Sequence, residues 1–124
     1  MSPGPAARLG AWAESAAADF LTARGFRILA RNFRTRFGEI DVIADDGRRL
    51  LLVEVKYRKN ESFDSVESSL TAAKRRKWWR AGRFAAAQFG ADRDIRFDFI
   101  AILGPPDRPD IRHFENVLSE NGRI

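Results

Sequence analysis

Hydrophobic and polar positions alternate at two different periods along the chain, and these periods predict helices and strands. Over residues 8–24 the apolar side chains recur at three- and four-residue spacing, which predicts an amphipathic helix that ends at Gly25. The same spacing over residues 72–89 predicts a second helix, with Thr71 as its N-terminal cap and Gly90 as its stop. These are the two long helices that the pattern supports.

Between and after the helices, the apolar residues follow the two-residue period of strands. The predicted strands cover residues 26–34, 38–44, 50–57 and 95–103, with a short edge strand over 111–117. Asp45, Asp46 and Gly47 are typical of a hairpin turn between the second and third strands. Residues 57–69 are polar and irregular, which predicts a mobile loop. The order αβββαββ indicates an α/β fold in which helices flank a mixed sheet.

The predicted hairpin sorts its side chains onto two faces. Alternation puts Ile40, Val42 and Ala44 on one face, and a two-residue turn sets Val42 opposite Leu51. The other face of the hairpin carries Glu39, Asp41, Glu54 and Lys56. A slip by two residues would keep both faces, whereas a slip by one would put acids among the apolar side chains. The hydrophobic pattern therefore selects an arrangement that gathers the charges.

Carboxylates gathered on one strand face repel one another unless cations lie between them. Lys56 supplies one positive charge, and a divalent ion held by Asp41 and Glu54 would supply the rest. The chain has no cysteine and one histidine, so its metal ligands must be mainly oxygen atoms, which Mg²⁺ or Mn²⁺ prefers. Such an ion activates water and polarises a phosphodiester, while a lysine stabilises charge on phosphate oxygens. The alternative is an exposed strand face with solvated charges.

The charge balance points to a polyanionic partner, because the net charge is +5. Six cations stand between residues 74 and 83, where a phosphate backbone would relieve their mutual repulsion. Trp78 fits the apolar stripe of this helix, and Trp79 could stack on a base or an arginine. The expected nucleic-acid contacts are Arg58, Lys74, Arg75, Arg76, Lys77, Arg80 and Trp79. The alternative is a solvated basic helix face.

Length and composition predict a single domain over residues 1–124, with frayed ends at 1–7 and 119–124. No apolar run approaches the roughly 18 residues of a membrane span, and the first residues lack a signal-peptide pattern. We therefore expect a cytoplasmic protein without a membrane partner. Asp98 shares its predicted strand face with Arg96, which favours a structural ion pair. The sequence indicates no role for His113.

Residues spread along the chain form a set that resembles the YraN family of small bacterial proteins. The set comprises Gly10, Glu14, Gly25, Phe26, Arg31, Asn32, GEID at 38–41, VEVKYR at 53–58, Lys74 and RFD at 96–98. That family is similar to nucleases of the restriction-endonuclease fold and to archaeal Holliday-junction resolvases. The resemblance implies a restriction-endonuclease-like mixed sheet.

The resemblance also implies roles for individual residues. Asp41 and Glu54 would bind Mg²⁺ or Mn²⁺, and Lys56 would be the catalytic lysine. Glu14 would be an extra acid from the first helix, and Glu39 an auxiliary carboxylate. Ile40 stands where a proline commonly precedes the first acid.

The function implied is metal-dependent endonuclease hydrolysis of DNA, including branched or junction DNA. A homodimer is a further expectation, because junction resolvases cut two strands symmetrically. Two alternatives stay open from the sequence. One is a non-catalytic nucleic-acid-binding module that retains the nuclease fold. The other is a protein-interaction adaptor that uses the loop at residues 57–69.

Overall fold

The computed structural model describes residues 4–59, 65–90 and 93–124. The elements are α1 (Pro5–Ala23), β1 (Arg27–Thr35), β2 (Gly38–Asp45), β3 (Arg49–Arg58), α2 (Val66–Ser69), α3 (Ala72–Gln88), β4 (Asp94–Leu103), β5 (Asp110–Phe114) and the 3₁₀ turn η1 (Glu120–Gly122). Both predicted long helices and all five predicted strands are present, which confirms the α/β class. The short elements α2 and η1 are additions to the predicted order.

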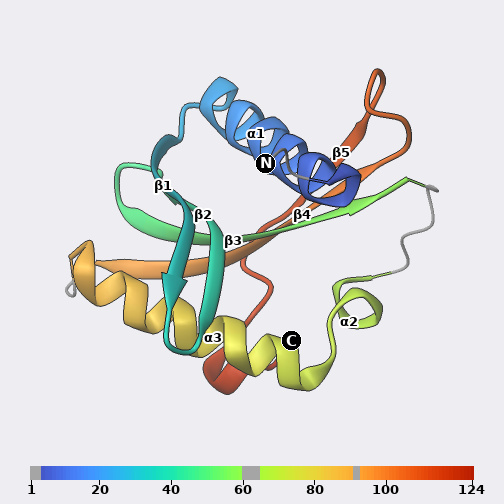
Figure 1. Ribbon diagram of the computed structural model, residues 1–124. Coiled ribbons are helices and arrows are strands. Elements are labelled where there is room, and N and C mark those ends of the chain that lie inside the picture. The colour runs from blue at the N-terminus through green and yellow to red at the C-terminus, as the bar shows by residue number, and fades with distance from the viewer. Residues whose placement is uncertain (1–3, 60–64, 91–92) are drawn as a thin grey trace.

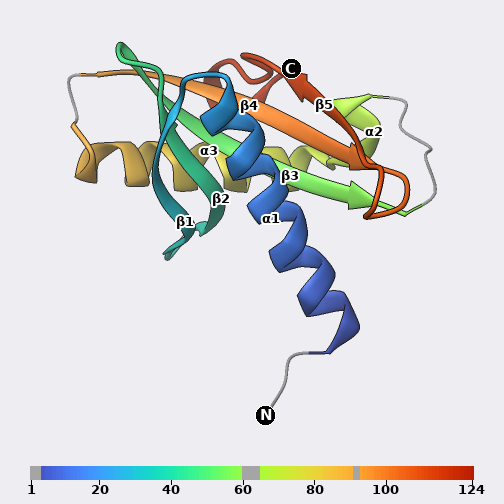
Figure 2. The same cartoon turned by 90° about the horizontal axis from the view of Figure 1, so that it is seen from above.

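The five strands form one mixed sheet in the order β1-β2-β3-β4-β5, consistent with a restriction-endonuclease-like fold. β3 and β4 run parallel and are connected through α2 and α3, whereas the other neighbouring pairs are antiparallel. α1 covers one face of the sheet and α3 covers the other (Figure 1). Seen from above, α1 crosses obliquely over the central strands (Figure 2). β3 is therefore the middle strand of a three-layer molecule.

The core lies on both faces of β3. Leu50 and Leu52 pack with α3, whereas Leu51 and Val53 pack with α1, and all four are 0% exposed. A strand buried on both faces needs a continuous apolar run, which explains the LLLV sequence. Charges that follow such a run stand at the end of a central strand.

Gly82 allows α3 to lie close to the sheet. A Cβ atom at this position would come within 2.3 Å of the Phe97 ring and 3.1 Å of the Leu52 side chain. Trp78, one turn earlier on α3, packs edge-on against the same Phe97 ring, with centroids 5.4 Å apart. This close approach brings the basic helix near the charged ends of β2 and β3.

The predicted caps of both long helices are confirmed. The Thr71 hydroxyl accepts a hydrogen bond from the backbone N–H of Lys74 at 3.2 Å. Gly25 follows α1 with a φ of +93°, a conformation that glycine adopts without steric cost.

The register of the β2–β3 hairpin differs from the predicted one by two residues. Val42 lies opposite Val53, not Leu51, and Asp45 lies opposite Leu50. The turn lies one residue later than predicted, because the Asp46 N–H donates to the Arg49 carbonyl oxygen at 3.2 Å and the Asp46 carboxylate accepts the backbone N–H groups of Arg48 and Arg49, at 2.9 and 2.6 Å. The two-residue period makes this slip invisible to the hydrophobic pattern.

The predicted alternation also fails at one position in β2. Val42 and Ala44 pack on the α1 side, as one face requires, but Ile40 packs on the α3 side. The ladder to β3 stops at Val42, and the Asp41 carboxylate accepts the N–H of Val55. The strands separate here, so Ile40 is free to turn toward the other layer.

Regular structure in the described residues reaches close to both ends of the chain. α1 already begins at Pro5. At the other end, η1 packs against α3, and a Cβ atom on Gly122 would come within 2.8 Å of the Arg75 carbonyl oxygen. Contact with α3 therefore orders the last turn of the chain.

Residues 60–64 of the predicted loop at 57–69 lie outside the described residues. The residues that follow form α2, which begins with a capping box between Ser65 and Ser68. No helix in the described ranges is long and apolar enough to cross a membrane.

Candidate active site

Three carboxylates from two elements meet where β2 and β3 separate. Glu14 comes from α1, and Glu39 and Asp41 come from the first half of β2. One oxygen of each carboxylate lies within 4.8 Å of an oxygen of the other two. Two ligands on opposite sides of Mg²⁺ are about 4.2 Å apart, so this spacing suits one shared ion.

Glu54 and Lys56 extend the group from β3. The Glu54 carboxyl group is in hydrogen-bond contact with that of Asp41. The Lys56 Nζ atom lies 3.8 Å from Glu54 Oε1. The second oxygen of Asp41, Oδ2, accepts the backbone N–H of Val55 at 2.8 Å. Asp41 thus links the acids of α1 and β2 to the Glu54–Lys56 pair of β3.

Burial raises the pKa values of the carboxyl groups of Asp41 and Glu54, so both bind protons more tightly than in water. It raises the pKa of Glu54 to about 8, and the neighbouring negative charge of Asp41 adds to the shift. Burial also raises the pKa of Asp41. Two carboxyl groups in contact in a poorly hydrated site cannot both ionise easily, so the pair shares a proton near neutral pH.

The pKa of Glu14, the acid that α1 contributes, is raised in the same way. Burial, followed by the charges of Asp41 and Glu39, raises its pKa to about 6. Its Oε1 atom is buried and has no hydrogen-bond partner among the described residues. A divalent cation would satisfy this oxygen and reverse the repulsion that raises these pKa values. The all-oxygen donor set therefore fits Mg²⁺ or Mn²⁺, with Asp41 as the shared residue.

A pocket of about 160 Å³ opens beside the acids on the α3 side of the sheet. Its lining residues are Gly38, Glu39, Glu54, Lys56, Leu70, Lys74, Lys77 and Trp78. Three lysines therefore face two carboxylates across a small hollow. That arrangement suits a phosphate group whose oxygens reach the lysines while its ester bond lies against the acids.

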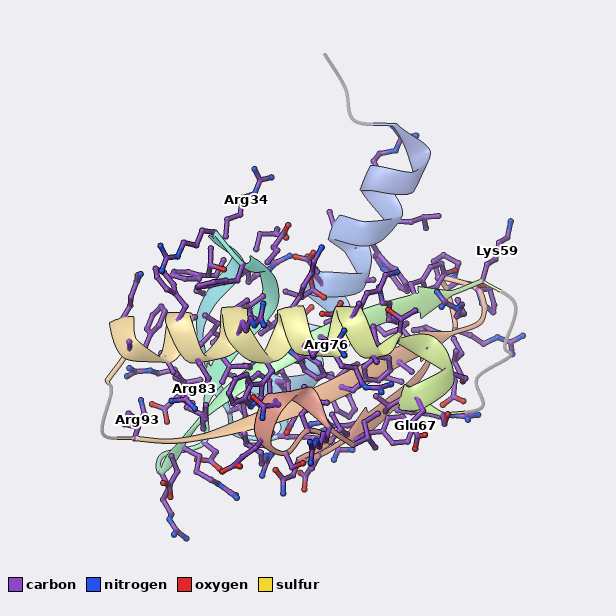
Figure 3. All side chains as sticks on the ribbon, turned by 90° about the horizontal axis from the view of Figure 1, so that it is seen from below. Arg34, Lys59, Glu67, Arg76, Arg83 and Arg93 are labelled. Carbon is purple, nitrogen blue, oxygen red and sulfur yellow. The ribbon has the colours of Figure 1, made fainter. Side chains whose placement is uncertain are left out.

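The remaining residues expected to contact nucleic acid are distributed differently. Arg76 is exposed on α3, the helix that faces the viewer in Figure 3. Arg75 instead donates to the Leu70 carbonyl at 2.9 Å and is half-buried. Arg58 lies exposed at the end of β3, and Trp79 and Arg80 line a neighbouring hollow. The structure thus brings Lys74 and Lys77, but not Arg75, to the acids.

The expected ion pair of Asp98 is confirmed and is larger than the sequence indicates. Arg96 donates two hydrogen bonds to the buried Asp98 carboxylate, both at 2.8 Å. His113 Nε2 lies 2.8 Å from the same carboxylate, and the Asn116 N–H donates to it at 3.0 Å. The sequence shows no signal for His113, because its partner stands on the neighbouring strand. This group joins β4 to β5 and to Asn116, which follows β5.

The fold and the site define a class: an α/β protein with a restriction-endonuclease-like sheet and a cluster of acids where two of its strands, β2 and β3, separate. Residues 13–102 match the model of the uncharacterised protein family UPF0102, and the chain belongs to that family. This match confirms the resemblance to the YraN family.

Relatives from several bacteria carry the same family name. A UPF0102 protein of Symbiobacterium thermophilum is 45% identical over 101 residues, covering 81% of this chain and 86% of that protein. A UPF0102 protein of Mycolicibacterium vanbaalenii is 40% identical over 113 residues, covering 90% and 93%. One of Geotalea daltonii is 44% identical over 112 residues, covering 89% and 88%.

Proposed function

We propose that this protein is a metal-dependent nuclease that hydrolyses phosphodiester bonds of DNA, including branched or junction DNA. The observation that carries the proposal is the meeting of Glu14, Asp41 and Glu54 from three elements, with Lys56 beside them. A structural role would not require a carboxyl group with a pKa as high as that of Glu54, nor a buried Glu14 oxygen without a hydrogen-bond partner among the described residues. A divalent cation and a phosphate ester together would satisfy all of these groups.

In the proposed reaction, the acids bind the metal and Lys56 binds the attacking water or the phosphate. Asp41, with Glu54, Glu14 and Glu39 around it, would hold Mg²⁺ or Mn²⁺. When bound, the cation supplies polarisation of the phosphodiester and activation of water. Lys56 is placed to hydrogen-bond the attacking water or a phosphate oxygen, whose growing negative charge it stabilises.

The basic helix supplies the substrate contacts in this proposal. Lys74 and Lys77 line the pocket beside the acids and would bind phosphate oxygens next to the scissile bond. Arg76, between these lysines in sequence, and Arg80, farther along α3, are exposed and would extend the contact along the backbone. The net charge of +5 agrees with a polyanionic substrate.

The test is cleavage of single-stranded, duplex, flap and four-way-junction DNA by the purified chain with Mg²⁺ or Mn²⁺. Asp41→Asn, Glu54→Gln and Lys56→Met should each lower the rate at least about 100-fold. Asp19→Asn, an exposed carboxylate on α1, is the matched control and should cleave normally. Activity that survives in the Asp41→Asn and Glu54→Gln variants, or its absence on every substrate, would contradict the proposal. Light scattering of the same samples tests the expected homodimer.

A second candidate is a nucleic-acid-binding module without catalysis. The exposed cations of α3 favour it, because Lys74, Arg76 and Lys77 are available without any metal. Binding would then be independent of Mg²⁺ and would weaken steeply with salt. The Asp41→Asn variant separates the two candidates, because a pure binding module would bind unchanged and show no cleavage to lose.

A further inference from the structure

A second hollow, lined by aromatic rings and arginines, lies next to the pocket at the acids. Its volume is about 440 Å³, and it is lined by Phe37, Trp79, Arg80, Arg83 and Phe84. The Phe37 and Phe84 rings lie 5.9 Å apart between centroids. Phe84 is 37% exposed, one of the few large apolar side chains of the described chain that stand in solvent. A ring left in water beside other rings is a surface for a flat partner.

Arginines already stack on these rings. The guanidinium of Arg83 lies 5.0 Å from the centre of the Trp79 ring, and that of Arg36 lies 4.8 Å from the Phe37 ring. Among the residues that the structure describes, Arg36, Arg80 and Arg83 form no ion pair. The hollow therefore combines aromatic rings with arginines that pair with no carboxylate in the described part of the chain. A partner that carries both flat rings and negative charge matches it.

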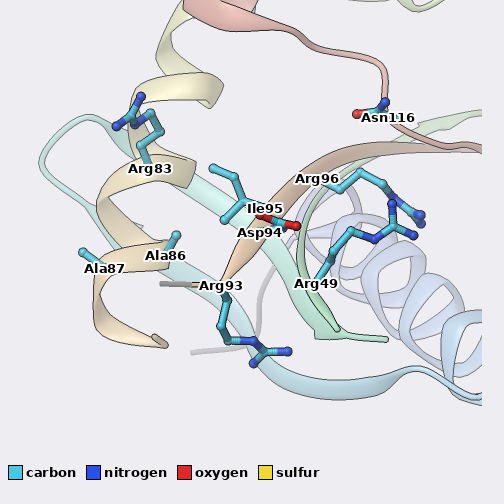
Figure 4. A pocket seen from close by; sticks show the side chains of 9 residues that line it. All are labelled: Arg49, Arg83, Ala86, Ala87, Arg93, Asp94, Ile95, Arg96 and Asn116. Carbon is cyan, nitrogen blue, oxygen red and sulfur yellow. The ribbon is translucent and has the colours of Figure 1, made fainter. Parts of the chain in front are cut away.

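The larger cavity of the molecule has a different charge balance. It measures about 690 Å³, and Figure 4 shows that four arginines line it. Three of them are paired with carboxylates: Arg49 with Asp46, Arg93 with Asp45 and Arg96 with Asp98. An anion at these three arginines would have to displace existing partners, and the fourth, Arg83, also lines the aromatic hollow. The aromatic hollow is therefore the better site despite its smaller volume.

The aromatic hollow and the acid pocket are neighbours. Phe37 lines the aromatic hollow, and the next residue, Gly38, lines the acid pocket. Trp79 likewise lines the aromatic hollow, whereas Trp78 lines the acid pocket. Along α3, Lys77 and Arg83 are separated by about 9 Å at 1.5 Å per residue. A single strand with a phosphate at the acids could therefore place a base one or two nucleotides away over the rings.

We propose that the aromatic hollow stacks an unpaired base of the strand whose phosphate lies at the acids. This inference rests on the proposed function for the phosphate position and adds the substrate class. Bases inside a duplex are stacked on each other and cannot offer their faces. The protein should therefore prefer nucleic acid with unpaired nucleotides, as in single strands, flaps or open junctions, over intact duplex. Arg83 and Arg36 would then contact the flanking phosphates or stack on the base.

The test measures binding of the full-length chain to a labelled 20-nucleotide single strand and to a duplex of equal length, in EDTA. Phe84→Leu and Trp79→Leu keep apolar volume but remove the π face. Each should weaken single-strand binding about tenfold and duplex binding by less than about twofold. Phe20→Leu is the matched control, because Arg24 stacks on Phe20 in α1 on the opposite side of the sheet. It should change neither affinity.

Unchanged single-strand binding in Phe84→Leu, or equal losses on single strand and duplex, would overturn the inference. Because Phe84 is exposed, Phe84→Leu should fold and can be measured for single-strand and duplex binding even if Trp79→Leu does not fold. Because EDTA removes catalysis, the two proposals fail separately. Metal-dependent cleavage with unaltered binding in the ring variants rejects only the stacking site. Selective binding losses in a protein that never cleaves reject only the nuclease.

Discussion

At the residue scale, ionisation of Glu54 should lower the free energy of unfolding. Its folded pKa of about 8 exceeds its ordinary value of 4.5, so the folded state binds its proton more tightly than the unfolded state. The unfolding free energy should therefore decrease as pH rises from about 4.5 to 8 in EDTA. Glu54→Gln removes this ionisation and should be more stable than the wild type by roughly 2–4 kcal/mol at pH 8.5, with no difference near pH 4.

Urea denaturation of both proteins across this pH range measures the difference. Glu67→Gln, on the exposed α2, is the control and should follow the wild type at every pH. Parallel curves for the wild type and Glu54→Gln would mean that Glu54 is already ionised in the fold. The same substitution should abolish cleavage, so one residue would oppose stability and support activity.

Single residues of the site were predictable to different degrees. The predicted alternation gathers Asp41, Glu54 and Lys56, but Asp41 meets Glu54 at the point where β2 separates from β3 and that alternation fails. Glu14 could not be derived from its own helix, since its contact with Asp41 depends on how α1 crosses the sheet. Only the family resemblance indicated it. His113 had no signal at all, because its partner Asp98 lies on another strand.

At the scale of elements, Gly82 controls how closely α3 approaches β3 and β4. An alanine there would overlap the Phe97 ring, which Trp78 packs edge-on. Gly82→Ala should lower the unfolding free energy by about 2–3 kcal/mol, as expected for overpacking in a filled core. It should also weaken DNA binding, because Lys74 and Lys77 move with the helix.

Gly10→Ala provides the matched control for this substitution. Gly10 lies in α1 and is exposed, and a methyl group added to it would meet no other atom within 4 Å. Alanine there should raise the unfolding free energy by up to about 1 kcal/mol through helix propensity. Equal effects of the two substitutions in chemical denaturation would show that α3 can shift away from the sheet without cost.

Elements were predicted well where the sequence itself supplies the start and the stop. Thr71 and Gly25 mark helix ends through local hydrogen bonds and backbone freedom, and both are confirmed. The hairpin turn was predicted one residue too early, because the hydrogen bonds of Asp46 that hold it leave no hydrophobic signature. The position of Ile40 was wrong for a related reason. Separation of β2 from β3 at Asp41 breaks the alternation, and a period cannot show where strands part.

At the scale of the whole molecule, the acid cluster ties together parts of the chain that only folding unites. Glu14 and Asp41 come from different elements on different layers, and Glu54 joins them from β3. An unfolded chain cannot present these oxygens to one ion, so metal binding should stabilise the native state alone. At a concentration of one hundred times the dissociation constant, the gain is about 2.7 kcal/mol, which corresponds to a rise in Tm of roughly 10 °C for a chain of 124 residues.

This stabilisation has a pH dependence that identifies the ligands. Protons compete with the ion for Glu14 and Glu54, whose pKa values are raised to about 6 and about 8. The rise in Tm with Mn²⁺ should therefore be larger at pH 8 than at pH 6, and Asp41→Asn should abolish it. Asp19→Asn should keep the full effect, because that carboxylate is exposed on α1. If calorimetry shows the same rise in Tm for Asp41→Asn, the ion binds elsewhere in the protein. The Asp41–Glu54 carboxyl pair would then share its proton without a metal.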